Sequence, residues 1–186
     1  MRIVAGKFKG RRLKSLEGSN TRPTSDKIKG AVFNMIGPYF DGETVLDLYC
    51  GSGNLALEAL SRGCSQAYCV DHHHQAIKVI KDNVSLLKAE QQVVIMKKKA
   101  AIALQEFAQA GNGFDLIFLD PPYMMQKIEE ELDFMLANGL IAERGTVVCE
   151  TDKSVELGEN ITGLICKKNQ LYGNTRITIY QKKAGA

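Results

Sequence analysis

The sequence lacks the features that mark secreted, membrane-spanning or disulfide-stabilised proteins. No apolar run approaches about 18 residues, and the amino terminus has no apolar signal core, so neither membrane insertion nor secretion is indicated. The five cysteines are odd in number and include no Cys-x-x-Cys pair. This pattern favours reduced thiols over a disulfide framework or a zinc site. We therefore expect a cytoplasmic protein that holds no metal.

Internal repeats and low-complexity tracts are also missing, and helical and strand patterns alternate along the 186 residues. Predicted strands cover residues 44–48, 67–70, 92–96, 114–119, 146–150, 164–168 and 176–180, and predicted helices cover 25–36, 54–61, 74–87, 100–110 and 126–137. No helix separates the last two strands, which predicts a closing antiparallel pair. The fold class is thus α/β: an open, doubly wound, mostly parallel seven-stranded sheet with ligands at the carboxyl ends of its strands.

Basic charge is concentrated at the amino-terminal end. Residues 1–29 hold nine Lys or Arg and two acidic residues, a net charge of +7, whereas the rest of the chain carries −4. Basic and apolar residues mix there with two turn-forming glycines, which predicts a hairpin that can lie along phosphates; a solvated polar arm is the alternative. We expect residues 1–23 to be a hairpin and loop appended to a domain of residues 24–186. The predicted nucleic-acid contacts are Arg2, Lys7, Lys9, Arg11, Arg12 and Arg22.

Asp120-Pro121-Pro122-Tyr123 follows a hydrophobic strand and predicts a site for an exocyclic amine. Prolines have no N–H donor, so the turn offers acceptors: the Asp120 carboxylate and the Pro121 carbonyl. Both protons of an –NH2 group could be held there while Tyr123 stacks on a flat base, which turns the nitrogen lone pair toward an electrophile. The pattern predicts alkylation of an amino group. The alternative is a Pro-Pro pair that merely ends a buried strand.

A glycine turn, Gly51-Ser52-Gly53, connects a buried strand to a helix and predicts a nucleotide-type cofactor. Its spacing also satisfies the dinucleotide fingerprint, with Asp71 after the next strand placed for ribose hydroxyls, so an NAD-dependent oxidoreductase is a candidate. Asp47 argues against it. A carboxylate in that turn would repel a pyrophosphate but attract the cationic amino-acid end of S-adenosylmethionine (SAM).

Three consecutive histidines follow Asp71 and invite a metal assignment. Successive positions on a helix diverge by about 100°, and a further ligand is missing nearby in the sequence, so we expect none of them to bind metal. His72 is expected instead to line the cofactor cleft.

Together these motifs resemble class I SAM-dependent methyltransferases, specifically the bacterial enzymes that methylate the exocyclic N2 amine of a guanine in 16S rRNA. The likeness covers nearly the whole chain and extends to segments 2–11, 22–27, 32–34, 57–63 and 172–173. It implies a Rossmann-like fold, SAM as cofactor, and 16S rRNA or an immature small ribosomal subunit as partner.

The resemblance also implies roles for single residues. Asp47, Gly51 and Gly53 fall on the cofactor loop, Asp71 on the ribose-binding acid, and the segment 120–123 on the clamp for a base presented out of its stack. Asp120 would orient the amine and accept its proton.

Two positions depart from similar sequences. Lys99 stands where an Asp commonly contacts the adenine of SAM, and Gly30 replaces an acid in a helix, where glycine costs about 1 kcal/mol relative to Ala. Two other functions therefore stay open: a DNA adenine-N6 methyltransferase, which shares the Asp-Pro-Pro-Tyr motif, and a catalytically weak RNA-binding ribosome assembly factor.

Overall fold

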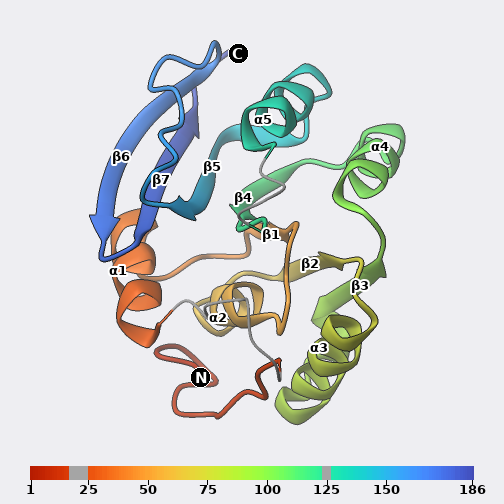
Figure 1. Cartoon of the computed structure of the whole chain (residues 1–186). Helices are drawn as coiled ribbons and strands as arrows, with labels where there is room; N and C mark the ends of the chain where they lie inside the picture. Colours follow the sequence, from red (N-terminus) through yellow and green to blue (C-terminus); the bar gives the residue numbers. More distant parts are fainter. Residues whose placement is uncertain (17–24, 123–126) are drawn as a thin grey trace.

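The computed structural model describes residues 1–16, 25–122 and 127–186. Seven strands form one mixed sheet, in which a single strand runs opposite to the other six, with helices on both sides (Figure 1). The elements in chain order are α1 (Asp26–Ile36), β1 (Thr44–Asp47), α2 (Asn54–Ser61), β2 (Gln66–Asp71), α3 (His74–Leu87), a 3-10 turn η1 (Glu90–Gln92), β3 (Val93–Lys97), α4 (Ala100–Ala110), β4 (Phe114–Leu119), α5 (Ile128–Ala137), β5 (Ile141–Asp152), β6 (Leu164–Tyr172) and β7 (Thr175–Lys182). Among these described residues, no helix is long and apolar enough to cross a membrane.

The strand order is β3-β2-β1-β4-β5-β7-β6. The first five strands are parallel, and β7 runs antiparallel to both of its neighbours. From β1 the chain continues outward to β2 and β3, then returns to β4 on the other side of β1. Ligands of open α/β sheets bind beyond the carboxyl ends of the strands at such a reversal, so β1 and β4 position the site.

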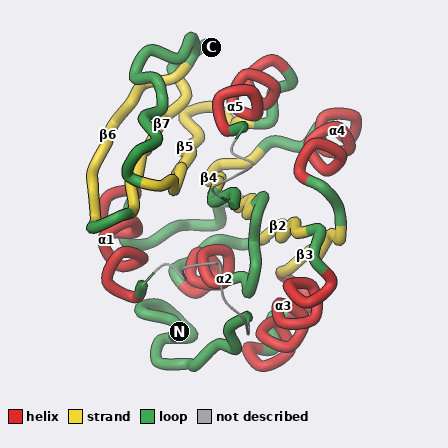
Figure 2. Tube along the Cα trace, in the orientation of Figure 1, coloured by secondary structure: helices red, strands yellow, loops and turns green. Residues whose placement is uncertain are grey.

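Alternation along the strands divides the core into two layers. Figure 2 shows the helices, in red, on both sides of the strands, in yellow. Val45 and Phe118 belong to a cluster with residues of α1, α2 and α3, whereas Leu46 and Ile117 belong to a cluster with residues of α4 and α5. Figure 1 shows the same division of the helices between the two sides of the sheet. Both faces are apolar because both are covered, as is typical of parallel sheets.

The amino-terminal segment differs from the predicted β-hairpin. Its two ends meet at one antiparallel bridge, Arg2 to Arg12, and no longer ladder forms. Ile3 donates to the carbonyl of Arg11 and accepts from the N–H of Gly10, both at 2.9 Å, but the next N–H groups, of Val4 and Ala5, donate to the carboxylate of Glu58 on α2, at 2.9 and 3.0 Å. The segment therefore follows the surface of α2 as a docked loop.

The other differences lie at element ends. Strand β5 begins five residues before the predicted range 146–150, and β6 continues to Tyr172, although its later residues are polar. As an edge strand paired only with β7, β6 exposes these residues to solvent, which hides its extent from a hydrophobicity pattern. Helix α1 starts at Asp26 because Ser25 caps it, accepting a hydrogen bond from the N–H of Ile28 at 3.2 Å.

Candidate active site

Three predicted site acids lie at one edge of the sheet. Asp47 ends β1, Asp71 ends the adjacent β2, and Asp120 directly follows β4 on the other side of β1. Because these strands are parallel, their carboxyl ends meet at the same edge. The fold thus brings together residues that are 24 or more positions apart in the sequence.

Asp47 is a buried carboxyl group with only 2% of its surface exposed. Its Oδ1 has no hydrogen-bond partner among the described residues. Burial raises the pKa of Asp47 to about 7; the charge of Asp71 and, less strongly, that of Glu150 act in the same direction, whereas the N–H groups of Ala56 and Tyr49 oppose the shift. A cation beside Oδ1 would favour the ionised form, since an opposite charge lowers the pKa of an acid.

The two glycines of the turn after β1, Gly51 and Gly53, differ in how closely neighbouring atoms approach them. Both have left-handed backbones, with φ of 52° at Gly51 and 80° at Gly53. A Cβ on Gly53 would lie 1.8 Å from Cδ1 of Ile80, so this glycine permits close packing of the turn on α3. A Cβ on Gly51 would make only an ordinary contact with Leu16. Ser52, between them, is buried, and its carbonyl accepts a hydrogen bond from Asn83 at 2.9 Å.

Asp71 ties the end of β2 to the glycine turn. Its Oδ2 accepts the N–H of Gly51 at 3.0 Å, and its Oδ1 accepts the N–H of His73 at 2.9 Å and lies 3.2 Å from His73 Nδ1. A carboxylate has about four acceptor positions, so capacity for a further donor remains. The Asp71 side chain is 11% exposed and can be reached from solvent.

The histidines do not follow the helix geometry assumed from the sequence. Helix α3 begins at His74, so His72 and His73 precede it, and their rings lie 3.7 Å apart rather than diverging. With Asp71 they form a group whose donor atoms lie within 4.8 Å of one another. The reasoning from helical divergence was wrong, and the absence of a metal stays a prediction.

Lys99 is exposed and stands at the N-cap of α4, just beyond β3. Its carbonyl accepts the N–H groups of Ile102 and Ala103 at 3.1 Å, so its backbone starts the helix. Lys98, the preceding residue, donates its N–H to the carbonyl of Asp71 at 3.0 Å. Lys99 therefore lies at the same sheet edge as Asp71. Nothing in the structure explains Gly30, whose Cβ position faces open space.

Asp120 stands beside a second carboxylate that the sequence reasoning missed. Leu119 of β4 pairs with Cys149 of β5, so the next residues, Asp120 and Glu150, are neighbours. Asp120 is partly exposed, whereas Glu150 is only 6% exposed. Burial raises the pKa of Asp120, and the charges of Glu150 and Asp47 raise it further. The available signal was an acid at the end of the predicted strand 146–150, which follows in the sequence.

Around this acid, Pro121 is buried and Pro122 is exposed, and Tyr123 lies outside the described residues. A second contact absent from the sequence reasoning joins the turn after β1 to α5: the hydroxyl of Tyr49 donates to Glu131. Burial raises the pKa of Glu131. Helix α5 follows the segment that contains Tyr123, so this hydrogen bond links the turn after β1 to the element after the predicted clamp.

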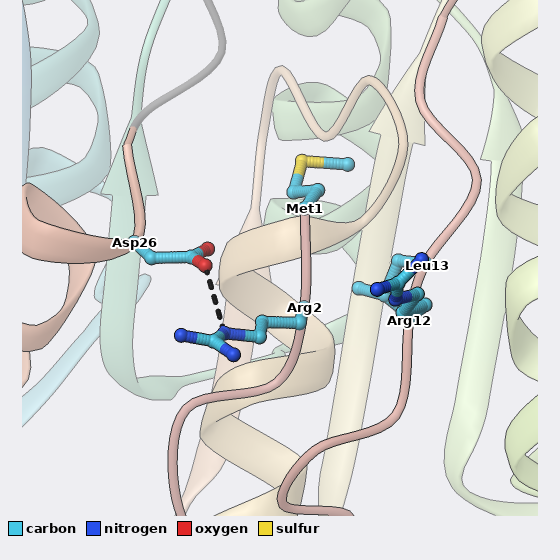
Figure 3. A pocket seen from close by; sticks show the side chains of 5 residues that line it. All are labelled: Met1, Arg2, Arg12, Leu13 and Asp26. Carbon is cyan, nitrogen blue, oxygen red and sulfur yellow. Dashed lines mark hydrogen bonds and ion pairs between the residues drawn. The ribbon is translucent and has the colours of Figure 1, made fainter.

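The predicted RNA-contacting residues are exposed where the structure describes them; these are Arg2, Lys7, Lys9, Arg11 and Arg12. Arg22 lies outside the described residues. Figure 3 shows Arg2 turned toward Asp26, with which it pairs at 3.2 Å, and Arg12 across a hollow of about 290 Å³ that Met1 and Leu13 also line. The charged side chains that line the hollow are Arg2, Arg12 and Asp26, and Arg2 is already paired with Asp26.

Residues 1–181 match the family model described as Conserved hypothetical protein 95. The chain belongs to this family. It is 43% identical to YlbH of Bacillus subtilis (strain 168) over 183 residues, covering 98% of this chain and all of the relative. It is 30% identical to a Haemophilus influenzae protein named Ribosomal RNA small subunit methyltransferase D, over 97% of this chain and 93% of the relative.

The fold agrees with the family assignment. The solved structure of a methyltransferase from Escherichia coli, yhhF, superposes with a TM-score of 0.85 at 27% identity, covering 99% of this chain and 98% of the other. The expected doubly wound, Rossmann-like α/β fold is confirmed.

Proposed function

We propose that this protein transfers the methyl group of SAM to the exocyclic N2 amine of a guanine in 16S rRNA. The observation that carries the proposal is the placement of a buried carboxyl group with an unpartnered oxygen, Asp47, one strand away from an acceptor-rich turn at Asp120 and Pro121. The buried Asp47 carboxyl group would be stabilised by a neighbouring cation, and the turn at Asp120 and Pro121 can accept hydrogen bonds from an amine. The named relative, a small-subunit rRNA methyltransferase, supports the same reaction and the same class of RNA.

The cleft suits SAM by its donor set. Asp47 would hold the positively charged amino-acid end, and Asp71 has acceptor capacity left for ribose hydroxyls. His72 and Lys99 would lie toward the purine, because both stand at the sheet edge next to Asp71. When bound, SAM supplies an electrophilic methyl group. No protein residue in this scheme needs a metal.

Asp120 and Pro121 would act on the base. The carboxylate and the carbonyl each accept one N–H of the amine, which fixes the nitrogen and directs its lone pair toward the cofactor cleft. The raised pKa of Asp120 makes its carboxylate a stronger base, so it is suited to take the proton that the amine loses as the new N–C bond forms. Tyr123 is proposed to stack on the ring.

Residues 1–23 are proposed to position the RNA, and residues 24–186 to form the catalytic domain. The support is the exposed basic loop, which Glu58 holds against α2 and thereby fixes relative to the sheet. A preordered loop loses little entropy on binding. The partner would be 16S rRNA or an immature small ribosomal subunit, which implies a cytoplasmic location.

The test is methyl transfer itself. The purified protein is incubated with methyl-labelled SAM and small ribosomal subunits that lack base methylation, and the RNA is digested to nucleosides. We expect label in N2-methylguanosine. A parallel incubation with DNA tests the alternative: label in N6-methyl-2′-deoxyadenosine, with none in the RNA, would support the DNA enzyme instead. SAM binding without transfer to either substrate would support an assembly factor.

Asp120→Ala is the matched variant for this assay. It should lower turnover by about 100- to 10,000-fold, because it removes the group that orients and deprotonates the amine, and it should leave SAM affinity unchanged. The control is Asp115→Ala at the opposite end of β4, where the carboxylate accepts the N–H of Thr44 at 2.8 Å. Full activity in Asp120→Ala would make the Asp-Pro-Pro segment a strand terminator only.

A further inference from the structure

Asn83 of α3 is a polar side chain enclosed between the amino-terminal loop, described over residues 1–16, and the glycine turn of residues 51–53. It is fully buried, and its amide makes three hydrogen bonds, all to backbone groups. Oδ1 accepts the N–H of Lys14 at 2.8 Å, and Nδ2 donates to the carbonyls of Lys14 at 3.0 Å and of Ser52 at 2.9 Å. One side chain thus joins the end of the loop to the turn.

These contacts explain why an amide stands at this position. The site needs one acceptor for an N–H and donors for two carbonyls, and an asparagine side chain provides both. An aspartate would turn acceptors toward two carbonyl oxygens, and a leucine would leave all three buried groups unpaired. A residue that served only the packing of α3 would be apolar, as the buried residues Ile80 and Val84 of the same helix are. Asn83 is therefore suited to its two distant partners, 69 and 31 residues away in the sequence.

The beginning of the loop is attached to the same turn from the other side, through α1. Nζ of Lys29 donates to the carbonyl of Arg2 at 2.6 Å and to Oδ1 of Asn54 at 2.7 Å. Asn54 follows Gly53 in the sequence, and Ser52 precedes it. The two ends of the loop are thus held by contacts to the two residues that flank Gly53. This arrangement fixes the position of the loop relative to the glycine turn, in addition to its attachment to α2.

We propose that Asn83 is a positioning residue for methyl transfer, which sets the place of the RNA-binding loop relative to the turn that holds SAM. This inference rests on the proposed function, in which the loop binds phosphates and the turn binds the cofactor. Their fixed relation then decides whether the target amine meets the methyl group. Rates depend steeply on such alignment, and a misplacement of about 1 Å caused far from the chemistry can cost about 100-fold. Affinity for RNA depends instead on the charges of the loop, to which Asn83 adds none.

The test separates turnover from binding in Asn83→Ala. With unmethylated small ribosomal subunits and saturating SAM, kcat should fall by about 10- to 100-fold, whereas KM for the subunits and the salt dependence of their binding should stay within about threefold of the parent. Val84→Ala is the matched control, because it also shortens a buried side chain of α3 but removes no hydrogen bond to the loop. It should keep kcat within about twofold. Both variants are assayed below their thermal unfolding transitions. An equal fall of kcat in both would make Asn83 a structural residue only and overturn the proposal.

A second pair of variants tests the loop side of the same contact. Lys14→Pro removes the N–H that Asn83 accepts and leaves the hydrogen bond to Ser52 in place, so kcat should fall by about 10-fold without a change in SAM affinity, measured by calorimetry. Lys14→Ala keeps the N–H, loses only an exposed ion pair with Asp82, and should keep kcat. If the two variants turn over equally, Asn83 serves the glycine turn alone and the proposal fails. A wild-type protein that binds SAM but methylates no subunit would instead remove the proposed function, and this inference with it.

Discussion

Two groups of buried charged side chains lie on the α2 side of the sheet, and they differ in how their charges are balanced. In the first, Glu58 accepts from Ala5 and Arg62 at one oxygen and from Val4 and Lys29 at the other, at 2.8 to 3.0 Å. The second consists of Asp47, Asp120 and Glu150 at the strand ends, whose negative charges raise the pKa values of Asp47 and Asp120. Oδ1 of Asp47 has no hydrogen-bond partner among the described residues.

The difference separates a structural network from a binding site. The Glu58 network is complete: Lys29 also donates to the carbonyl of Arg2 at 2.6 Å and to Asn54 at 2.7 Å, and the guanidinium of Arg62 packs on Phe33. The partner that this network binds is the amino-terminal loop of the same chain. At the strand ends, by contrast, Oδ1 of Asp47 has no partner among the described residues, so the burial of this carboxylate becomes favourable when a cation arrives. The comparison therefore predicts opposite effects of removing a charge from each.

The largest effect is expected from the complete network. Glu58→Ala leaves Lys29 and Arg62 buried without their counter-charge, so the free energy of unfolding should fall by about 3 to 5 kcal/mol. The measurement is urea unfolding at neutral pH. Glu106→Ala is the control, because Glu106 pairs with Lys98 at the surface and should change stability by less than about 1 kcal/mol. Equal effects of the two variants would contradict the structural role of the Glu58 network.

Removing a charge from the incomplete group should do the reverse. The folded-state pKa of Asp47, about 7, lies above its ordinary value of 3.8, so the folded protein binds this proton more tightly than the unfolded chain does. Stability is therefore lost as the pH rises from about 4 to 7, and the cost is fully present above that window. Asp47→Asn removes this cost and should stabilise the SAM-free protein by about 1 to 3 kcal/mol at pH 8.

The same variant should bind SAM more weakly, since the amide offers no negative charge to the amino-acid end. Unfolding near pH 3, below the ordinary pKa of 3.8, where Asp47 is mostly protonated in both states, serves as the internal control: the two proteins should then be nearly equally stable. A variant that is less stable at pH 8 and binds SAM normally would mean that Asp47 is a structural acid like Glu58.

The amino-terminal loop, which the Glu58 network holds, gives a smaller and purely electrostatic effect. Replacing Lys7, Lys9, Arg11 and Arg12 with Ala should reduce the slope of log affinity for 16S rRNA against log salt by up to about 3 units, because each phosphate contact contributes about 0.7 to 0.9. SAM affinity should not change. The matched control replaces Lys167 and Lys168 on the distant edge strand β6. An unchanged slope in the fourfold variant would make the loop a docked but RNA-independent element.

The two groups were not equally readable from the sequence. Asp47, Asp71 and Asp120 could be predicted because each ends a hydrophobic strand and the alternating pattern implies a parallel sheet, which brings such ends together. Glu150 required knowing that its strand lies beside that of Asp120. Glu58 could not be found at all: it sits inside a helix, where an acid ordinarily indicates the solvent face, and its partners Val4 and Lys29 are distant in sequence.

The same long-range contact explains why the hairpin prediction was only approximate. Local signals at Gly6 and Gly10 gave the reversal correctly, and both residues have positive φ. The two arms pair at Ile3, but the partner of the N–H groups beyond it depends on tertiary structure, and here a carboxylate 54 residues away from Val4 accepts. Local sequence patterns, such as turn-forming glycines or the alternation of a strand, carry no information about a partner that is so distant in the sequence.

The smallest effect concerns Lys99, the one basic residue that the resemblance places at the adenine. Its side chain is exposed at the start of α4, beside the strand that pairs with β2, so it borders the acidic edge without neutralising it. Lys99→Asp should tighten SAM binding by about three- to tenfold, because a carboxylate can accept the adenine amine and also suits a helix N-terminus better than an ammonium group does. Calorimetric titration measures this, and Lys97→Asp, two residues earlier at the end of β3, controls for net charge. If Lys99→Asp binds SAM more weakly than the parent while Lys97→Asp does not, Lys99 makes a contact of its own with SAM. The positive charge of Lys99 would then offset part of the negative charge of the acids at the strand ends.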